Sequence, residues 1–232
     1  MGALTPLGEG LFVLDGPPAR DMGMPFTTRM SVVRLRDGSL WVSSPVPLPF
    51  DVLSELASLG PIRYIVSATP RHFWRLNRWH TLFPDAELWS SPITPFTLKR
   101  GDLPLAGVLG DLVPAAWSHD LDHVVLGGRM LAESVFFHRS SATLLIEDVI
   151  QIHEPLPGHP VSNTVFRLDG VAAPAGGVSR DIRLAFRPRG VERAAVQRIL
   201  DWPVETVVLA HGPVITRDAR RFLENAFEWL MT

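Results

Sequence analysis

The chain has 232 residues, 46% of them hydrophobic and 20% charged, which is enough apolar material for one well-buried α/β domain. Its net charge of −2 excludes the strongly basic surface of a nucleic-acid-binding protein and gives no attraction to an anionic membrane. Because it contains no cysteine, disulfides, thiolate nucleophiles and cysteine metal ligands are excluded. The first residues lack the pattern of a signal peptide and no apolar run is long enough to span a membrane, so we expect a cytoplasmic protein.

Short apolar, β-branched runs predict a series of strands along the chain. Residues 30–44 contain two such runs around Asp37-Gly38, a pair that favours a type I′ turn, and therefore predict a hairpin. The other predicted strands span residues 11–14, 62–66, 86–89, 135–138, 143–146 and 206–210.

Apolar residues at helical spacing predict helices at 50–57 and 191–202 and an amphipathic helix over 222–230. Residues 92–118 are rich in Pro and Gly and predict no particular element. Residues 153–190 are similar in composition and are interpreted as surface connection with short elements. There is no repeat and no linker, so we expect a single domain over the whole chain.

Three predicted strands lead to side chains that can bind a metal. The stretches are Ser67–His72, Leu145–Asp148 and Val208–Gly212, which deliver a His, an Asp and a His. Because α/β folds present their chemistry at the carboxyl ends of strands, these side chains are candidates for a common site.

The order of these elements, together with the strings "TRMSVVRLRDGSLWVSSPV", "FPDAELWSSP", "ESVFFHRSSATLLIEDV" and "VVLAHG", resembles the metallo-β-lactamase superfamily over nearly the whole chain. More narrowly, the chain is similar to a divergent subgroup of that superfamily with no assigned activity. The resemblance implies an α/β fold, an αββα sandwich with metals held at one edge.

The ligand loop of that superfamily has the pattern Thr-His-x-His-x-Asp-His. Aligned from Thr69, the four ligand positions are occupied here by Pro70, His72, Trp74 and Arg75, so three of the four ligands are missing. The motif is therefore degenerate, and these residues exclude the two-metal site that the family builds.

Other parts of the family pattern are better retained. Asp148 matches the bridging aspartate, although Glu147 replaces the glycine that usually precedes it. Ala210-His211-Gly212 nearly matches the terminal Gly-His-Gly, whereas Ser43-Ser44-Pro45 replaces an acidic Asp-x-Gly. The resemblance therefore implies that Asp148 and His211 still belong to a metal site.

The predicted hairpin suggests a substitute ligand. If its turn is centred between residues 140 and 141, Glu133 lies directly opposite Asp148, with Cβ atoms about 5 Å apart. The resulting site has fewer ligands than that of the family. It contains His72, Glu133, Asp148 and His211 and suits one Zn, Fe or Mn ion. Asp148 and Glu133 are the candidate catalytic groups, with Glu133 as a ligand or general base. The alternative for the cofactor is that no metal binds.

Each candidate also has a structural interpretation. His72 would be an ordinary exposed histidine, Asp148 the cap of a turn, and His211 a buried histidine satisfied by hydrogen bonds. By the same register His138 lies about 16 Å from Glu133 along the strand, and is expected to be structural, with a hydrogen bond near the turn.

Two further stretches resemble metal motifs without matching their positions in the family. Residues 118–123, with sequence SHDLDH, come about forty residues too late and are interpreted as a solvated connection. Pro157-Gly158-His159 follows the bridging aspartate instead of preceding it. Neither is predicted to bind a metal.

The loop over 71–79 is rich in arginine and tryptophan. Arg71 and Arg75 are candidates for binding an anionic group of a substrate, because guanidinium groups bind carboxylates and phosphates in a bidentate manner. In the alternative, Trp74 and Trp79 face the core and the arginines are surface charges.

The sequence predicts a metal-dependent hydrolase with a mononuclear site, acting on a small-molecule substrate. The alternative is a metal-free binding or regulatory protein on the same scaffold, and metal-dependent redox chemistry at one iron is a third possibility. A hydrolase requires His72, Asp148 and His211 to converge, whereas in a binding protein Trp74 and the arginines would fill the pocket. Neither the substrate nor the oligomeric state follows from the sequence.

Overall fold

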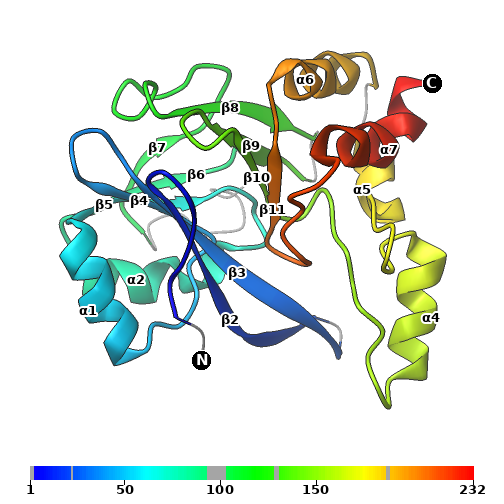
Figure 1. Cartoon of the computed structure of the whole chain (residues 1–232), viewed down its shortest axis with the longest axis horizontal. Helices are drawn as coiled ribbons and strands as arrows, with labels where there is room; N and C mark the ends of the chain where they lie inside the picture. The colour runs from blue at the N-terminus through cyan, green and yellow to red at the C-terminus, as the bar shows by residue number, and fades with distance from the viewer. Residues whose placement is uncertain (1–2, 22, 93–102, 128–130, 187–188) are drawn as a thin grey trace.

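The structure is a computed structural model that describes residues 3–21, 23–92, 103–127, 131–186 and 189–232. Two β-sheets pack face to face, with helices on both outer faces (Figure 1). This αββα sandwich confirms the fold class that the sequence predicts. No helix in the described ranges is long and apolar enough to cross a membrane.

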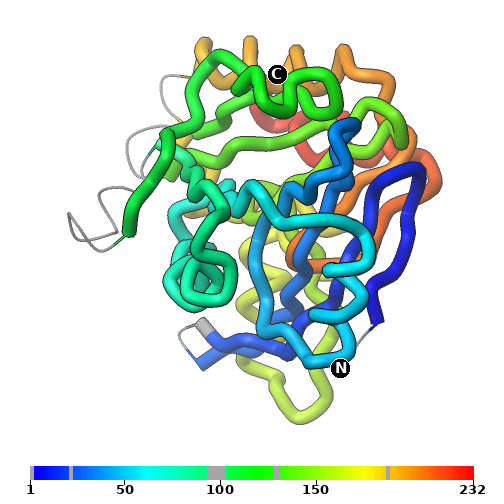
Figure 2. Tube along the Cα trace, turned by 90° about the vertical axis from the view of Figure 1, so that its left-hand side faces the viewer, coloured from blue at the N-terminus to red at the C-terminus, as the bar shows by residue number. Residues whose placement is uncertain are grey.

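The first sheet contains seven strands in chain order. They are β1 (Thr5–Gly8), β2 (Leu11–Asp21), β3 (Met24–Arg34), β4 (Leu40–Ser43), β5 (Ile62–Ser67), β6 (Glu87–Ser90) and β7 (Leu105–Val108). The first four strands are antiparallel and β4 to β7 are parallel. Helices α1 (Phe50–Leu59) and α2 (Leu76–Leu82) lie on the outer face of this sheet, the side from which Figure 2 views the molecule.

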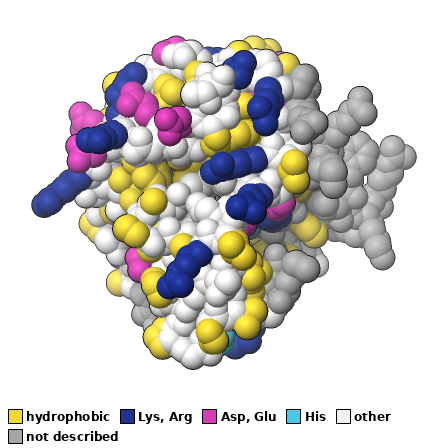
Figure 3. All heavy atoms as spheres, turned by 90° about the vertical axis from the view of Figure 1, so that its right-hand side faces the viewer, with side chains coloured by type: hydrophobic (Ala, Val, Ile, Leu, Met, Phe, Trp, Pro, Cys, Tyr) yellow, Lys and Arg dark blue, Asp and Glu magenta, His cyan; other side chains and the backbone are white. Residues whose placement is uncertain are grey.

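The second sheet has the order β11-β10-β9-β8. These strands are β8 (Leu121–Leu126), β9 (Glu133–His138), β10 (Thr143–Ile146) and β11 (Thr206–Leu209). The helices on this side are α4 (Pro160–Asp169), α5 (Arg180–Ala185), α6 (Arg189–Asp201) and α7 (Ala219–Met231). Figure 3 faces this side of the molecule and shows basic side chains among hydrophobic ones. The exposed hydrophobic residues of α4 and α5 include Val161, Leu168 and Leu184.

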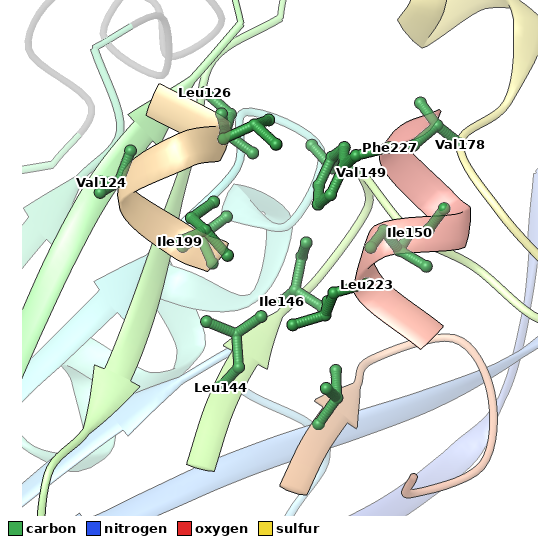
Figure 4. Packing of buried hydrophobic residues seen from close by; sticks show 14 of the residues in the cluster. Val124, Leu126, Leu144, Ile146, Val149, Ile150, Val178, Ile199, Leu223 and Phe227 are labelled. Atoms are coloured by element: carbon green, nitrogen blue, oxygen red, sulfur yellow. The ribbon is translucent and has the colours of Figure 1, made fainter. Parts of the chain in front are cut away.

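Three apolar clusters hold the layers together. One lies between the two sheets and includes Trp41 of β4 and Phe136 of β9, whose rings meet edge to face at 4.7 Å. A second joins the first sheet to α1 and α2. In the third, Ile199 of α6 and Leu223 of α7 pack over Ile146 of β10 (Figure 4). Both outer helical layers are therefore attached by burial of apolar surface.

The hairpin formed by β3 and β4 confirms the prediction for residues 30–44, but its turn is wider than a type I′ turn. Leu35 N–H bonds to the Ser39 carbonyl and Gly38 N–H to the Leu35 carbonyl. A type I′ turn requires positive φ at both central residues, whereas only Gly38 has it, at 82°. The predicted turn type is therefore wrong.

The structure also contains more regular elements than the sequence predicts. β2 continues to Asp21 through Pro17-Pro18, beyond the expected end of the first strand, with an irregular register between Gly16 and Ala19. Residues 153–190 hold helices α4 and α5, and α4 begins at Pro160, which is suited to a first turn that needs no N–H donor. Within the undecided stretch 92–118, residues 93–102 lie outside the described ranges.

Candidate metal centre

The ends of three strands bring His72, Asp148 and His211 together. His72 follows β5 of the first sheet, while Asp148 and His211 follow β10 and β11 of the second. All three side chains are buried, and each offers one ligand atom within 4.8 Å of the others. The structure thus places these three predicted residues at one site, at the edge where both sheets end.

The three ligand atoms form a nearly regular triangle. His72 Nε2 lies 3.1 Å from His211 Nε2 and 3.5 Å from Asp148 Oδ1, and His211 Nε2 lies 3.3 Å from the same Oδ1. In a tetrahedral zinc site with bonds of 2.0–2.2 Å, two ligand atoms are separated by about 3.3–3.6 Å. The measured distances have the dimensions of one face of such a tetrahedron.

The backbone of the β2–β3 hairpin sets the tautomer of His211. Its Nδ1 lies 2.6 Å from the carbonyl oxygen of Thr27, and the ring of Phe26 meets the imidazole edge to face at 4.9 Å. Since a carbonyl oxygen only accepts, Nδ1 carries the hydrogen. The Nε2 lone pair of neutral His211 therefore faces the other two ligand atoms.

His72 is oriented by Glu147 and Ser44. Its Nδ1 lies 2.8 Å from Glu147 Oε2 and 2.8 Å from Ser44 Oγ. Ser44 adopts φ of 55°, an uncommon conformation for a residue other than glycine. The other Glu147 oxygen accepts the Ser43 hydroxyl. A carboxylate at this distance favours a proton on Nδ1, so Nε2 of neutral His72 is also left as an acceptor.

Three hydrogen-bond acceptors that face one another require a cation between them. In the metal-free protein this cation is a proton on His72. Burial alone would lower the pKa of His72, but the carboxylates of Asp148 and Glu147 have the larger effect and raise this pKa to about 9. A divalent ion is the other cation that fits. Two imidazole nitrogens and one carboxylate oxygen suit zinc, iron or manganese.

Asp148 is held in its ionised form. Burial opposes ionisation, but His72 and His211 together lower the pKa of this carboxyl well below its usual range. Its second oxygen, Oδ2, accepts the Thr69 hydroxyl at 2.6 Å. Oδ1 is therefore the oxygen directed at the two histidines.

Glu133 is not brought into this group. The β9–β10 register agrees with the prediction, since Thr143 pairs with His138 and Leu145 with Phe136. Glu133 also lies near Asp148, because its carboxylate accepts the Asp148 N–H. Its carboxylate, however, accepts three backbone N–H groups, those of residues 147, 148 and 149, at 2.5, 2.8 and 2.7 Å. Because both oxygens are occupied in this way, Glu133 holds the loop that carries Asp148 and is not placed as a ligand.

Burial, Asp148 and Glu147 raise the pKa of Glu133 to about 8, although the N–H groups of residues 147 and 148 oppose the rise. Three carboxyl groups are thus packed into one buried region, and Glu147 is the one for which the sequence predicts no role. Its replacement of a glycine beside a predicted ligand was the available signal, because a carboxylate there can reach a ligand histidine.

The other histidine predictions have separate outcomes. His138 is buried and its Nδ1 lies 2.7 Å from Ser141 Oγ, which confirms the structural role expected for it near the turn. The solvated connection predicted over 118–123 is wrong. Asp120 is buried and bonds to the backbone N–H of Arg36, and His123 lies in β8 with Nε2 2.6 Å from the Gly110 carbonyl.

A cavity of about 800 Å³ opens beside His72, Asp148 and His211. Its wall includes Phe26, Trp74, Phe166 and the two arginines predicted to bind an anion, Arg71 and Arg75. Trp79 is a core residue, as in the structural interpretation, but Trp74 is 53% exposed. The cavity is therefore lined, and not filled, by the tryptophan and arginine side chains of this loop.

Solved structures similar to this chain share its fold at low sequence identity. A metallo-β-lactamase from Hirschia baltica has a TM-score of 0.64 at 15% identity, covering 98% of this chain and 96% of that one. A metallo-β-lactamase from Pontibacter korlensis gives 0.63 at 12%, covering 99% and 98%. The Flv1 flavodiiron core from Synechocystis gives 0.65 at 14%, covering 98% of this chain and 60% of that one.

No curated protein matches the sequence significantly. A family model, described as a domain of unknown function (DUF4336), matches residues 22–164. That range includes His72 and Asp148 together with Glu133, and ends before His211. The chain belongs to the DUF4336 family and has the metallo-β-lactamase fold.

Proposed function

We propose that the protein is a metal-dependent hydrolase with a mononuclear site formed by His72, Asp148 and His211. The observation that carries this proposal is the triangle of ligand atoms, with edges of 3.1, 3.3 and 3.5 Å. Each histidine has its other nitrogen engaged, in His211 by the Thr27 carbonyl and in His72 by the Ser44 hydroxyl and the nearby Glu147 carboxylate, which is the arrangement that presents Nε2 to a metal.

A divalent ion at this position would activate water for attack on a small-molecule substrate. The protein supplies the geometry around it. Thr69 directs one oxygen of Asp148 away from the histidines, and Glu133 fixes the backbone of the Asp148 loop. The cavity of about 800 Å³ has the size of a small-molecule binding site and lies directly beside the three side chains.

The test is the metal content of the purified chain, measured by elemental mass spectrometry after loading with Zn²⁺, Fe²⁺ or Mn²⁺ and gel filtration. The wild type is expected to retain about one ion per chain, and a double Asp148→Ala/His211→Ala variant to lose at least ~90% of it. His138→Gln is the matched control, since it removes a buried histidine outside the cluster and should leave the metal content unchanged.

Thermal unfolding of each variant shows whether it is folded. No retained metal in a folded wild type under any loading condition would contradict the hydrolase proposal. It would favour the second candidate, a metal-free binding protein. The observation behind that candidate is the position of His72 between the carboxylates of Glu147 and Asp148, at 2.8 and 3.5 Å, because they raise its pKa and a proton on His72 would satisfy the cluster.

A further inference from the structure

Some charged side chains in the cavity wall form ion pairs and others do not. Besides Asp148, its wall carries two carboxylates, Asp169 and Asp181. Asp181 lies 2.7 Å from Arg71 and also accepts the Ser179 hydroxyl. Asp169 accepts the backbone N–H of Arg180 at 2.8 Å. Arg71 therefore already has a carboxylate partner within the wall and is not the arginine best placed to receive an anion.

Arg75 is in a different position. It is half-buried, and its guanidinium carbon lies 4.8 Å from the centre of the Trp74 ring, where the aromatic face holds it by a cation–π contact. Across the residues that the structure describes, no carboxylate lies within ion-pairing distance of Arg75. A guanidinium fixed in this way at a cavity wall keeps its donors available for a bidentate partner.

The surface next to Arg75 is aromatic and apolar. Trp74 is about half exposed on the cavity side of the loop, and Phe26, Val165 and Phe166 form other parts of the wall. His153 stacks on Phe166 at 4.2 Å, and burial lowers its pKa to about 4, so it adds no charge at neutral pH. The third arginine of the wall, Arg20, is an exposed side chain of β2. The wall therefore offers one half-buried cation outside an ion pair, Arg75, beside these apolar side chains.

We propose that the cavity binds an amphipathic monocarboxylate, whose carboxylate pairs with Arg75 and whose apolar group packs against Trp74 and Phe26. A carboxylate is favoured over a phosphate dianion because Asp169 lies in the same wall, within the described residues has no ion-pair partner, and repels a second negative charge. This inference rests on the proposed function, since it names the substrate class as esters or amides that carry such a carboxylate.

The test is calorimetric titration of the metal-free, chelator-treated chain with 4-phenylbutanoate and with its neutral counterpart, 4-phenylbutanamide. Arg75→Gln is expected to weaken carboxylate binding about tenfold or more, because a charge-assisted hydrogen-bond pair is lost, and to leave amide binding unchanged. Arg75→Lys should restore part of the loss. Trp74→Ala should weaken both ligands.

Arg78→Gln is the control, because Arg78 is exposed on the same segment but does not line the cavity. Equal binding of carboxylate and amide by the wild type would overturn the proposal, as would an Arg75→Gln variant that binds 4-phenylbutanoate normally or tighter binding of phenyl phosphate. Because no metal is present, these outcomes are independent of the metal-content experiment, and a failure of either proposal can be recognised separately.

Discussion

Glu133→Ala is expected to destabilise the protein by about 3–5 kcal/mol, since each buried N–H left without an acceptor costs roughly 1–3 kcal/mol. The carboxylate accepts three such groups from one loop, and nothing else among the described residues bonds to them. A loss of this size is comparable with the whole stability of a small domain, about 5–15 kcal/mol. Glu133→Gln keeps an acceptor oxygen and the side-chain shape, so its cost should be clearly smaller.

Glu192 provides a matched control for this experiment. It is also a buried glutamate, but its carboxylate accepts only one backbone N–H, that of Gly127 at 2.8 Å. Urea unfolding of the metal-free wild type and of Glu133→Ala, Glu133→Gln and Glu192→Ala measures the loss of unfolding free energy that each substitution causes. If Glu133→Ala costs no more than Glu192→Ala, the three-donor role of Glu133 is wrong.

The metal-free protein is expected to lose stability as the pH rises from about 6.5 to 9. Below pH 6.5 the buried His153, whose pKa is lowered to about 4, opposes the loss because its neutral form is favoured as the pH rises. His72 has a folded pKa of about 9 against an ordinary value of 6.5, so its contribution is complete below pH 6.5 and is lost as the pH rises through 9. That difference corresponds to about 3 kcal/mol. The pKa of Glu133, raised from 4.5 to about 8, acts in the same direction between those values. Asp148, with its lowered pKa, contributes above its ordinary value of 3.8 and loses that contribution in acid.

Metal binding must reverse this trend, because a ligand histidine has to release its proton. The apparent affinity for the ion is expected to rise about tenfold per pH unit up to about pH 9, as the proton on His72 is displaced more easily. Urea unfolding at pH 5, 7 and 9, with and without chelator, measures both effects. His72→Gln should make the metal-free profile less steep, because only the Glu133 contribution remains, and His138→Gln should not. A wild-type profile that stays flat between pH 6.5 and 9 would refute the pKa assigned to His72.

The sequence predicts much of the fold because its strands are marked by local patterns. β10 spans the predicted residues, and the centre of the β9–β10 turn predicts the observed register. The sequence does not predict helices α4 and α5 individually, because the stretch that holds them is rich in Pro and Gly, a composition typical of surface connections.

For the site, the sequence predicts which side chains lie near one another better than it predicts what they bond to. His72, Asp148 and His211 meet as expected. Glu133 is also near, but the competition between a cation and three backbone N–H groups for its oxygens depends on the path of the loop over 147–149, which no residue pattern encodes. The role of Glu147 likewise requires the distance to a histidine 75 residues earlier in the chain.

The hydrogen bonds around His72, Asp148 and His211 also connect the two sheets to each other. Thr27, Ser43 and Thr69 belong to the first layer, and their partners His211, Glu147 and Asp148 belong to the second. A bound ion would add coordinate bonds between the same two sheets, since His72 follows a strand of the first sheet and the other two ligands follow strands of the second. Loss of the ion should therefore weaken this contact between the sheets first. Amide hydrogen exchange should become faster at the ends of β4, β5, β10 and β11 before it does in α6 and α7.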